Sequence, residues 1–139
     1  MKANIFTHIL VATALFTSCA ASKNANVMAG EWDVVNLNGT SITPETNVTP
    51  FLGFDVANNH VYGFTGCNRL TGQLEASALA KGKADFSQLG CTRMLCQDDQ
   101  YERAFLQALD EVKHSRLQDE RTLQLLDKKG NAIITLRKR

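Results

Sequence analysis

The sequence predicts an α+β domain, mainly antiparallel β, in which about seven or eight short strands form a small curled sheet or barrel-like shape with one α-helix. Three observations lead to this prediction. Short segments of strand character are separated by Gly, Asn and Pro turn signals. One late segment instead repeats its apolar residues at helical spacing. The 139 residues leave room for one hydrophobic core.

Apolar content and turn residues define the strands of the first half. Asn38-Gly39 is a strong turn signal after the first strand, and the polar stretch 41–49 reads as a loop. An Asn-Asn pair joins the next two strands into a hairpin, and a Lys-Gly-Lys turn separates the last two. The strands expected here are 31–37, 51–56, 60–64, 73–76 and 84–86.

The expected helix begins after Asp98-Asp99, either of which can cap it, and Glu102 has capping-box spacing from Asp99. Its apolar residues recur three or four positions apart and form one core-facing stripe: Tyr101, Phe105, Ala108, Leu109 and Val112. A closing hairpin turns through Lys-Lys-Gly-Asn, with one more strand before it. These last strands are 115–118, 122–127 and 132–136.

Residues 1–18 have the layout of a secretory signal: a positive charge at Lys2, a mainly apolar run over 5–16 and small residues before Cys19. The run falls short of the roughly 20 apolar residues that a transmembrane helix needs. The order Leu-Phe-Thr-Ser-Cys ending at Cys19 is similar to a bacterial lipobox, although Phe16 stands where leucine is usual. We expect lipidation of Cys19; the alternative is an ordinary cleaved signal followed by an incidental cysteine.

The expected organisation is a signal peptide over 1–18, a lipidated flexible tether over 19–29 and a domain over 30–139. The tether is rich in Ala, Asn and Ser, as flexible linkers are. A diacylated amino terminus holds a protein firmly on a membrane, so we expect an outer-membrane lipoprotein of the bacterial envelope that faces the periplasm. A net charge of +1 gives no field that would attract nucleic acid. We expect a monomer.

The stretch 63–72, Gly-Phe-Thr-Gly-Cys-Asn-Arg-Leu-Thr-Gly, concentrates the unusual residues of the chain. Gly66 can adopt a positive φ at little steric cost, and Asn68 can cap a turn with its side chain. We interpret the stretch as a structural bend at the end of a strand. The alternative is a binding or redox site at Cys67.

Three cysteines remain when Cys19 is assigned to the anchor: Cys67, Cys91 and Cys96. An exported protein can form disulfides, and an odd number leaves one thiol over. We favour Cys67 with Cys96, because closing a loop of that size stabilises a fold by about 3–4 kcal/mol in the chain-entropy model. Cys91 with Cys96 is the alternative, which would close a small loop and constrain little.

No pattern in the sequence indicates a catalytic, cofactor or metal site, and we expect none. His60 and His114 are the histidines outside the signal, and nothing in the sequence brings either one to Cys67 as a catalytic pair. A zinc site needs about four ligands in compact pairs, and Cys91 and Cys96 lack a second pair. The glycines of 63–72 lack the spacing and the following helix of a nucleotide-binding loop.

Two motifs, in order, resemble the META-domain family, which includes the HslJ-like heat-shock lipoproteins. The first is Gly-Phe-Thr-Gly-Cys-Asn-Arg over 63–69, and the second is Thr-Arg-Met-Leu-Cys over 92–96, directly before the helix. The resemblance spans about 30–136 and implies that Cys67 and Cys96 are the two cysteine positions of the family, with Cys91 an addition. The motif residues are Gly66, Cys67, Asn68, Thr92, Met94 and Cys96.

The resemblance implies a compact, mainly β domain of the bacterial envelope, linked to heat stress or to antibiotic stress such as novobiocin resistance. It implies no reaction and supplies no catalytic residue. We therefore expect a non-enzymatic lipoprotein that contributes to stress tolerance through an unidentified protein or ligand. One alternative is an inhibitor or adaptor of an envelope protease or assembly machine, with an exposed apolar patch beside a loop such as 41–49. The other is a thiol-redox protein with an accessible cysteine of low pKa.

Overall fold

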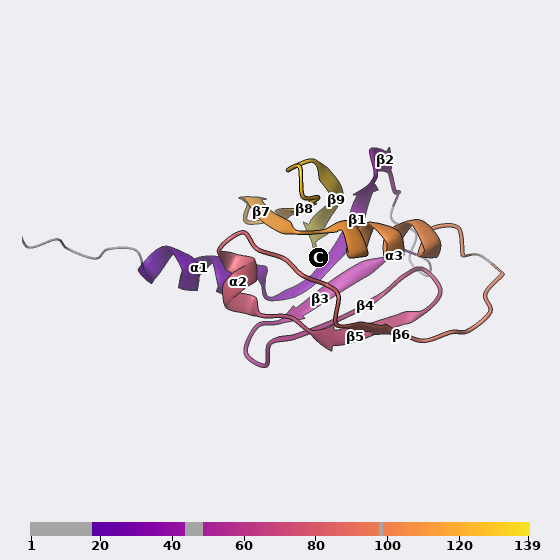
Figure 1. The fold of residues 1–139 in the computed structure, drawn as a ribbon, viewed down its shortest axis with the longest axis horizontal. Coiled ribbons are helices and arrows are strands. Elements are labelled where there is room, and N and C mark those ends of the chain that lie inside the picture. Colours follow the sequence, from indigo (N-terminus) through magenta and orange to yellow (C-terminus); the bar gives the residue numbers. More distant parts are fainter. Residues whose placement is uncertain (1–17, 44–48, 98) are drawn as a thin grey trace, which may run out of the picture.

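Strands of one antiparallel sheet make up most of the computed structural model, which describes residues 18–43, 49–97 and 99–139 (Figure 1). The strands are β1 (Gly30–Leu37), β2 (Thr40–Ser41), β3 (Phe51–Asp55), β4 (His60–Phe64), β5 (Arg69–Gln73), β6 (Leu89–Cys91), β7 (His114–Asp119), β8 (Thr122–Leu126) and β9 (Ala132–Lys138). The helices are α1 (Ser18–Met28), α2 (Ala76–Ala80) and α3 (Glu102–Glu111). The strand order is β6-β5-β4-β3-β1-β9-β8-β7, and β2 pairs with β1.

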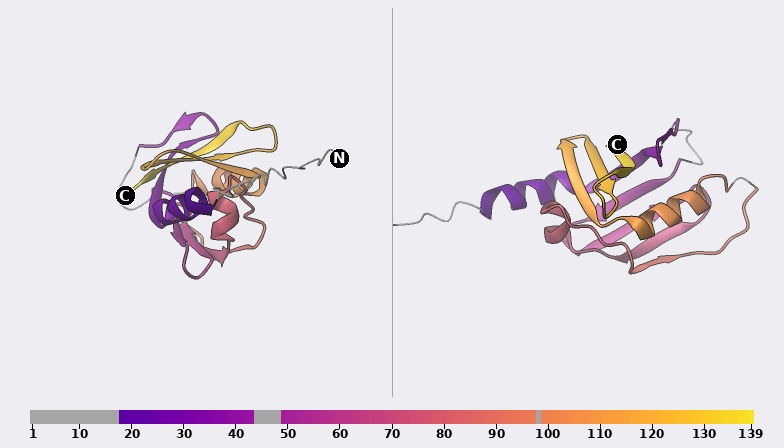
Figure 2. Two further views of the ribbon diagram at one scale, coloured as in Figure 1. Left: turned by 90° about the vertical axis from the view of Figure 1, so that its left-hand side faces the viewer. Right: turned by 45° about the horizontal axis from the view of Figure 1, so that its top comes forward.

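The sheet curls without closing into a barrel (Figure 2). The end strands β6 and β7 do not pair with each other. Instead, the chain that follows α2 lies along β7: the Ser115 N–H donates to the Gly82 carbonyl at 3.1 Å, and the Ala84 N–H donates to the Lys113 carbonyl at 3.2 Å. The prediction of an α+β, mainly antiparallel, curled sheet is confirmed, and the sheet is not closed into a barrel because its end strands are unpaired. Among the described residues there are nine strands, where seven or eight were expected, and three helices, where one was expected.

Both predicted hairpins are present. β3 pairs with β4 from Phe51 opposite Phe64 to Asp55 opposite His60, and β8 pairs with β9 after β7, as predicted. Two short strands were predicted wrongly. β5 already begins at Arg69, so the chain after it is free to form α2 from a run rich in alanine, the strongest helix former. The strand predicted at 84–86 is instead β6, a few residues later.

Helix α1 replaces the flexible segment that the composition of 19–29 predicts. Its last residue, Met28, is fully buried, and the Trp32 indole N–H donates to the Met28 carbonyl at 2.8 Å. The carboxyl end of this segment is therefore part of the folded domain. The signal peptide was predicted over 1–18, and its residues 1–17 lie outside the described residues. No helix within the described ranges has the length and apolar content to cross a bilayer.

The core lies inside the curl of the sheet and is closed by α3. A β-bulge between Val34 and Asn36 in the pairing of β1 with β9 turns Leu37 inward together with Trp32 and Val34. The predicted stripe is confirmed as core packing: Phe105, Ala108, Leu109 and Val112 are buried, and Tyr101 is half-buried against the core. Other fully buried side chains come from both halves of the sheet: Leu52, Val61, Leu123, Leu125, Ile134 and Leu136.

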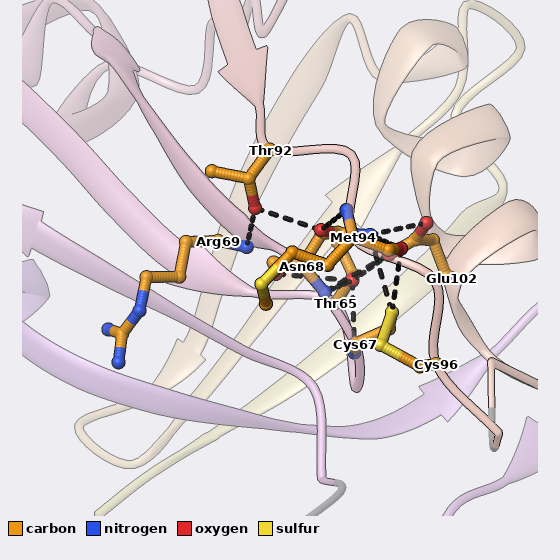
Figure 3. The surroundings of a disulfide bond; sticks show 8 residues. All are labelled: Thr65, Cys67, Asn68, Arg69, Thr92, Met94, Cys96 and Glu102. Carbon is orange, nitrogen blue, oxygen red and sulfur yellow. Dashed lines mark hydrogen bonds between the residues drawn. A yellow bond between two sulfur atoms is a disulfide. The ribbon is translucent and has the colours of Figure 1, made fainter.

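The predicted capping box at the start of α3 is not formed. Tyr101 occupies the cap position and makes no side-chain capping bond. Asp98 lies outside the described residues, and Asp99 contributes its backbone carbonyl, which accepts the Glu102 N–H at 3.0 Å. The Glu102 carboxylate points away from its own helix cap, toward the turn between β4 and β5 (Figure 3).

Candidate functional site

The turn between β4 and β5 is a tight corner over 65–68. Gly66 has a φ of +98°, which favours glycine. The Thr65 N–H donates to the Asn68 carbonyl at 2.8 Å, and the Thr65 hydroxyl oxygen accepts the Asn68 N–H at 2.8 Å and the Cys67 N–H at 3.2 Å. Thr65 and Asn68 are buried. The structural bend predicted at this stretch is therefore present.

Glu102 on α3 bonds this corner directly (Figure 3). Its carboxylate accepts the Asn68 backbone N–H at 3.1 Å and the Asn68 side-chain N–H₂ at 3.0 Å, and it also contacts the Thr65 hydroxyl. No ion pair involves Glu102 in the described ranges. A carboxylate in the first turn of a helix is favoured by the helix dipole. Sequence reasoning assigned Glu102 to the capping box and so missed this contact.

The side chain of Asn68 also holds the segment 92–96. Its Oδ1 accepts the Met94 N–H at 2.7 Å and the Thr92 hydroxyl at 2.9 Å, and its Nδ2 donates to the Met94 carbonyl at 3.2 Å. The Thr92 hydroxyl oxygen accepts the Arg69 N–H at 2.9 Å. The amide thus uses both lone pairs of its oxygen and both N–H donors within the fold.

Cys67 and Cys96 form a disulfide that adds a covalent bond to the same junction. Their Cα atoms are 5.8 Å apart, within the usual range for a disulfide. The predicted pairing is confirmed, and the Cys91–Cys96 alternative is wrong. The corner 65–68, the segment 92–96 and the first turn of α3 are therefore neighbours in space, joined by one buried amide and one cross-link.

Cys91 is a free, half-buried thiol in β6. Burial raises the pKa of this thiol, the negative charge of Glu102 raises it further, and Arg93 opposes the shift. A raised pKa leaves less thiolate at neutral pH, which is the opposite of what a reactive cysteine needs. The added cysteine therefore has the electrostatic environment of a structural residue.

Two apolar side chains beside this network face solvent. Met94 is 59% exposed, and Leu95 is 105% exposed, as much as in an isolated extended peptide. The inhibitor or adaptor alternative predicts an exposed apolar patch beside a loop such as 41–49. In that stretch Ile42 is buried and 44–48 lie outside the described residues, and the large apolar side chains that face solvent are instead Met94 and Leu95. We call Met94–Leu95 the apolar tip.

The remaining candidates lie away from this junction. His60 is on β4, where its Nε2 is 2.8 Å from the Thr71 hydroxyl, and His114 begins β7. Helix α1, which contains Cys19, and the connection from β6 to α3 lie at opposite ends of the molecule (Figures 1 and 2). Across the described ranges, His, Cys, Asp and Glu side chains form no group of three or more that could hold a metal ion.

Comparison with known proteins gives a family and a fold. A family model described as META domain matches residues 25–139. An NMR structure of a protein from Burkholderia xenovorans is similar, with 23% identity and a TM-score of 0.59, over 97% of this chain and 99% of that one. A second NMR structure is 21% identical, with a TM-score of 0.59, over 82% of this chain and 92% of that one. No protein with a curated description matches.

Proposed function

The chain belongs to the META domain family, and from this membership we propose that it is a non-enzymatic lipoprotein of the bacterial envelope that supports tolerance of heat or antibiotic stress by binding a partner protein. The observation that carries the proposal is the apolar tip, Met94–Leu95, exposed on a segment that the fold holds in place. The partner would contact this tip.

The backbone around the apolar tip is held in place, yet the Leu95 side chain is exposed, and this combination favours binding of a partner. A leucine side chain contributes about 1.5–3 kcal/mol when it is buried, and Leu95 contributes none of this to the fold. Ordering the segment around it carries an entropic cost of about 1–2 kcal/mol per residue. The Asn68 amide and the Cys67–Cys96 disulfide offset that cost. A partner that covers Leu95 gains the free energy of burying this side chain and does not have to order the segment 92–96.

The chemistry of the junction supports a binding role over an enzymatic one. The polar side chains that meet there, Thr65, Asn68 and Glu102, are bonded to one another. Two of the three cysteines in the domain are joined in the disulfide, and the pKa of Cys91 is raised. The thiol-redox alternative would need a cysteine whose pKa is lowered.

The position of α1 is compatible with attachment through Cys19. A lipid on Cys19 would leave the apolar tip at the other end of the molecule, directed away from the anchoring membrane (Figure 1). A partner in the periplasm, rather than the anchoring bilayer, would then meet the tip. We propose that the protein is an outer-membrane lipoprotein that faces the periplasm and acts as a monomer.

Site-specific photo-crosslinking in intact cells tests the proposal. We expect a photoreactive amino acid at position 95 to cross-link one envelope protein under heat stress, and the same amino acid at Lys129, an exposed turn residue, to cross-link none. Leu95→Ser should lower survival under stress to that of a strain lacking the protein, with unchanged abundance. Full survival of the Leu95→Ser strain would contradict the proposal.

A further inference from the structure

We propose that Arg93–Leu95 is a preformed, substrate-like strand that enters the active-site cleft of an envelope endopeptidase and inhibits it, with Leu95 in the primary specificity pocket. This inference rests on the proposed function and specifies the class of the partner. It follows from the backbone of the segment as well as from its exposed side chains.

The hydrogen bonds of Asn68 define the backbone conformation at Met94. One side-chain amide bonds both the N–H of Met94, at 2.7 Å, and its carbonyl, at 3.2 Å. The N–H and C=O of a single residue point to the same side when the chain is extended, as in a β-strand, and to opposite sides in a helix. Met94 is therefore extended, with both backbone groups facing the interior.

The neighbouring residues consequently present their backbone groups to solvent. In an extended chain, the N–H and C=O groups of successive residues alternate between the two edges. Those of Arg93 and Leu95 point away from Asn68, and no backbone partner for either residue occurs in the described part of the chain. The outer edge of the segment is thus open for strand addition by another polypeptide.

The shape of the segment 92–96 indicates that the partner surface is a cleft. Leu95 protrudes, at 105% exposure, and the open stretch lies between Thr92 and Cys96, which are both fixed to the corner. Strands that pair within sheets usually have about five or six residues. A short, convex stretch with a protruding side chain fits a concave site better than a flat sheet edge.

An endopeptidase cleft has the required features. Addition of an extended peptide to a partner's backbone supplies affinity, and pockets for alternate side chains supply specificity. Arg93 and Leu95 are alternate residues with open backbone groups, and Leu95 suits an apolar primary pocket. The disulfide at Cys96 and the bonds to Met94 hold the segment before binding, which reduces the entropic cost of association.

Transfer of specificity tests the proposal. The full-length chain, purified in detergent with its disulfide intact, would be assayed against subtilisin and chymotrypsin, which accept apolar side chains, and against trypsin, which accepts Arg and Lys. We expect inhibition of at least one of the first two enzymes and none of trypsin. Leu95→Arg should weaken the first inhibition by about tenfold or more and create inhibition of trypsin.

Glu120→Arg is the matched control, because Glu120 is also exposed but lies in the turn between β7 and β8. It should leave the inhibition unchanged and should not act on trypsin. Failure of a folded Leu95→Arg variant to inhibit trypsin would overturn the proposal, as would rapid cleavage after Leu95 with loss of inhibition. A cross-link from position 95 in cells, without inhibition of any protease, would support the proposed partner protein but exclude an endopeptidase as that partner.

Discussion

The carboxylate of Glu102 accepts hydrogen bonds from both the backbone and the side-chain amide of Asn68, 34 residues earlier in the chain. This pair joins the corner between β4 and β5 to the first turn of α3. Because the same amide also holds Met94, the position of the apolar tip depends on the packing of the helix. The stability of the fold and the position of the apolar tip are therefore coupled through Asn68.

Asn68→Asp should destabilise the fold by about 3 kcal/mol at pH 7, because it removes the N–H₂ donor and places a second carboxylate beside Glu102. The like charge raises the pKa of the new carboxyl above its unfolded value. The proton is therefore bound more tightly in the folded state, and stability should fall as the pH rises and recover toward pH 4.

Urea denaturation at pH 7 and at pH 4 measures this effect. Asn26→Asp, at an exposed position of α1, is the control and should change stability little at either pH. An equal loss for Asn68→Asp at both pH values would contradict the role assigned to Glu102.

Removing the disulfide with Cys67→Ala and Cys96→Ala together should lower the free energy of unfolding by about 3–4 kcal/mol, as expected for a cross-link spanning 29 positions. Denaturation in the presence and absence of a reductant measures the loss. Cys91→Ser should retain the full sensitivity to reductant, and peptide mapping without reduction should recover Cys67 linked to Cys96. Recovery of a linked Cys91 would refute the assignment.

Local patterns predicted most of the fold. The hairpins of β3 with β4 and of β8 with β9, and the core stripe of α3, follow from alternation, turn residues and helical spacing. Those signals act over a few residues. The strands predicted at 73–76 and 84–86 were misplaced, and α2 was not predicted. The positions of these elements depend on where β5 begins and on the distant backbone of Gln88, which packs beside Gly72.

The residues of the candidate site could be predicted from the sequence, but the hydrogen bonds that join them could not. The motif resemblance grouped Asn68, Met94 and the cysteine pair, and the structure brings them together. Glu102 was missed because its spacing from Asp99 satisfies a capping box, a local arrangement that the long-range bond to Asn68 displaces. The sequence analysis made no prediction about the exposure of Leu95, because the exposure of a loop residue depends on which distant residues pack beside it.

Gly63→Ala should destabilise the fold by about 1–3 kcal/mol, because a Cβ there would lie 2.4 Å from the Phe51 carbonyl oxygen and backbone cannot move aside cheaply. Gly90→Ala is the matched control, since the nearest atom to its Cβ would be at an ordinary 3.7 Å. Thermal unfolding of both variants measures the difference. Equal melting temperatures would mean that β3 and β4 are not packed as described.

Alkylation of Cys91 by iodoacetamide should be slow at neutral pH. Because burial and Glu102 raise the pKa of the thiol, the midpoint of the rate against pH should lie above that of glutathione. Arg93→Gln should move the midpoint further upward, because Arg93 lowers this pKa. A midpoint below that of glutathione would revive the thiol-redox alternative.

Lipidation at Cys19 predicts incorporation of radiolabelled palmitate into the wild-type chain and none into Cys19→Ala. The variant should leave the membrane fraction, because its hydrophobic anchor is lost. Cys91→Ala serves as the control and should label normally. Undiminished labelling of Cys19→Ala would exclude the lipobox.

The bond from the Trp32 indole to the Met28 carbonyl fastens the end of α1 to the first long strand. A lipid on Cys19 would then be separated from the domain by a helix rather than by a random coil. Cys19 is nine residues before Met28 in α1, so at 1.5 Å per residue the two are roughly 14 Å apart along the helix. The distance of the domain from the bilayer would then be set by the length of α1. Inserting whole helical turns into α1 should increase that distance in regular steps.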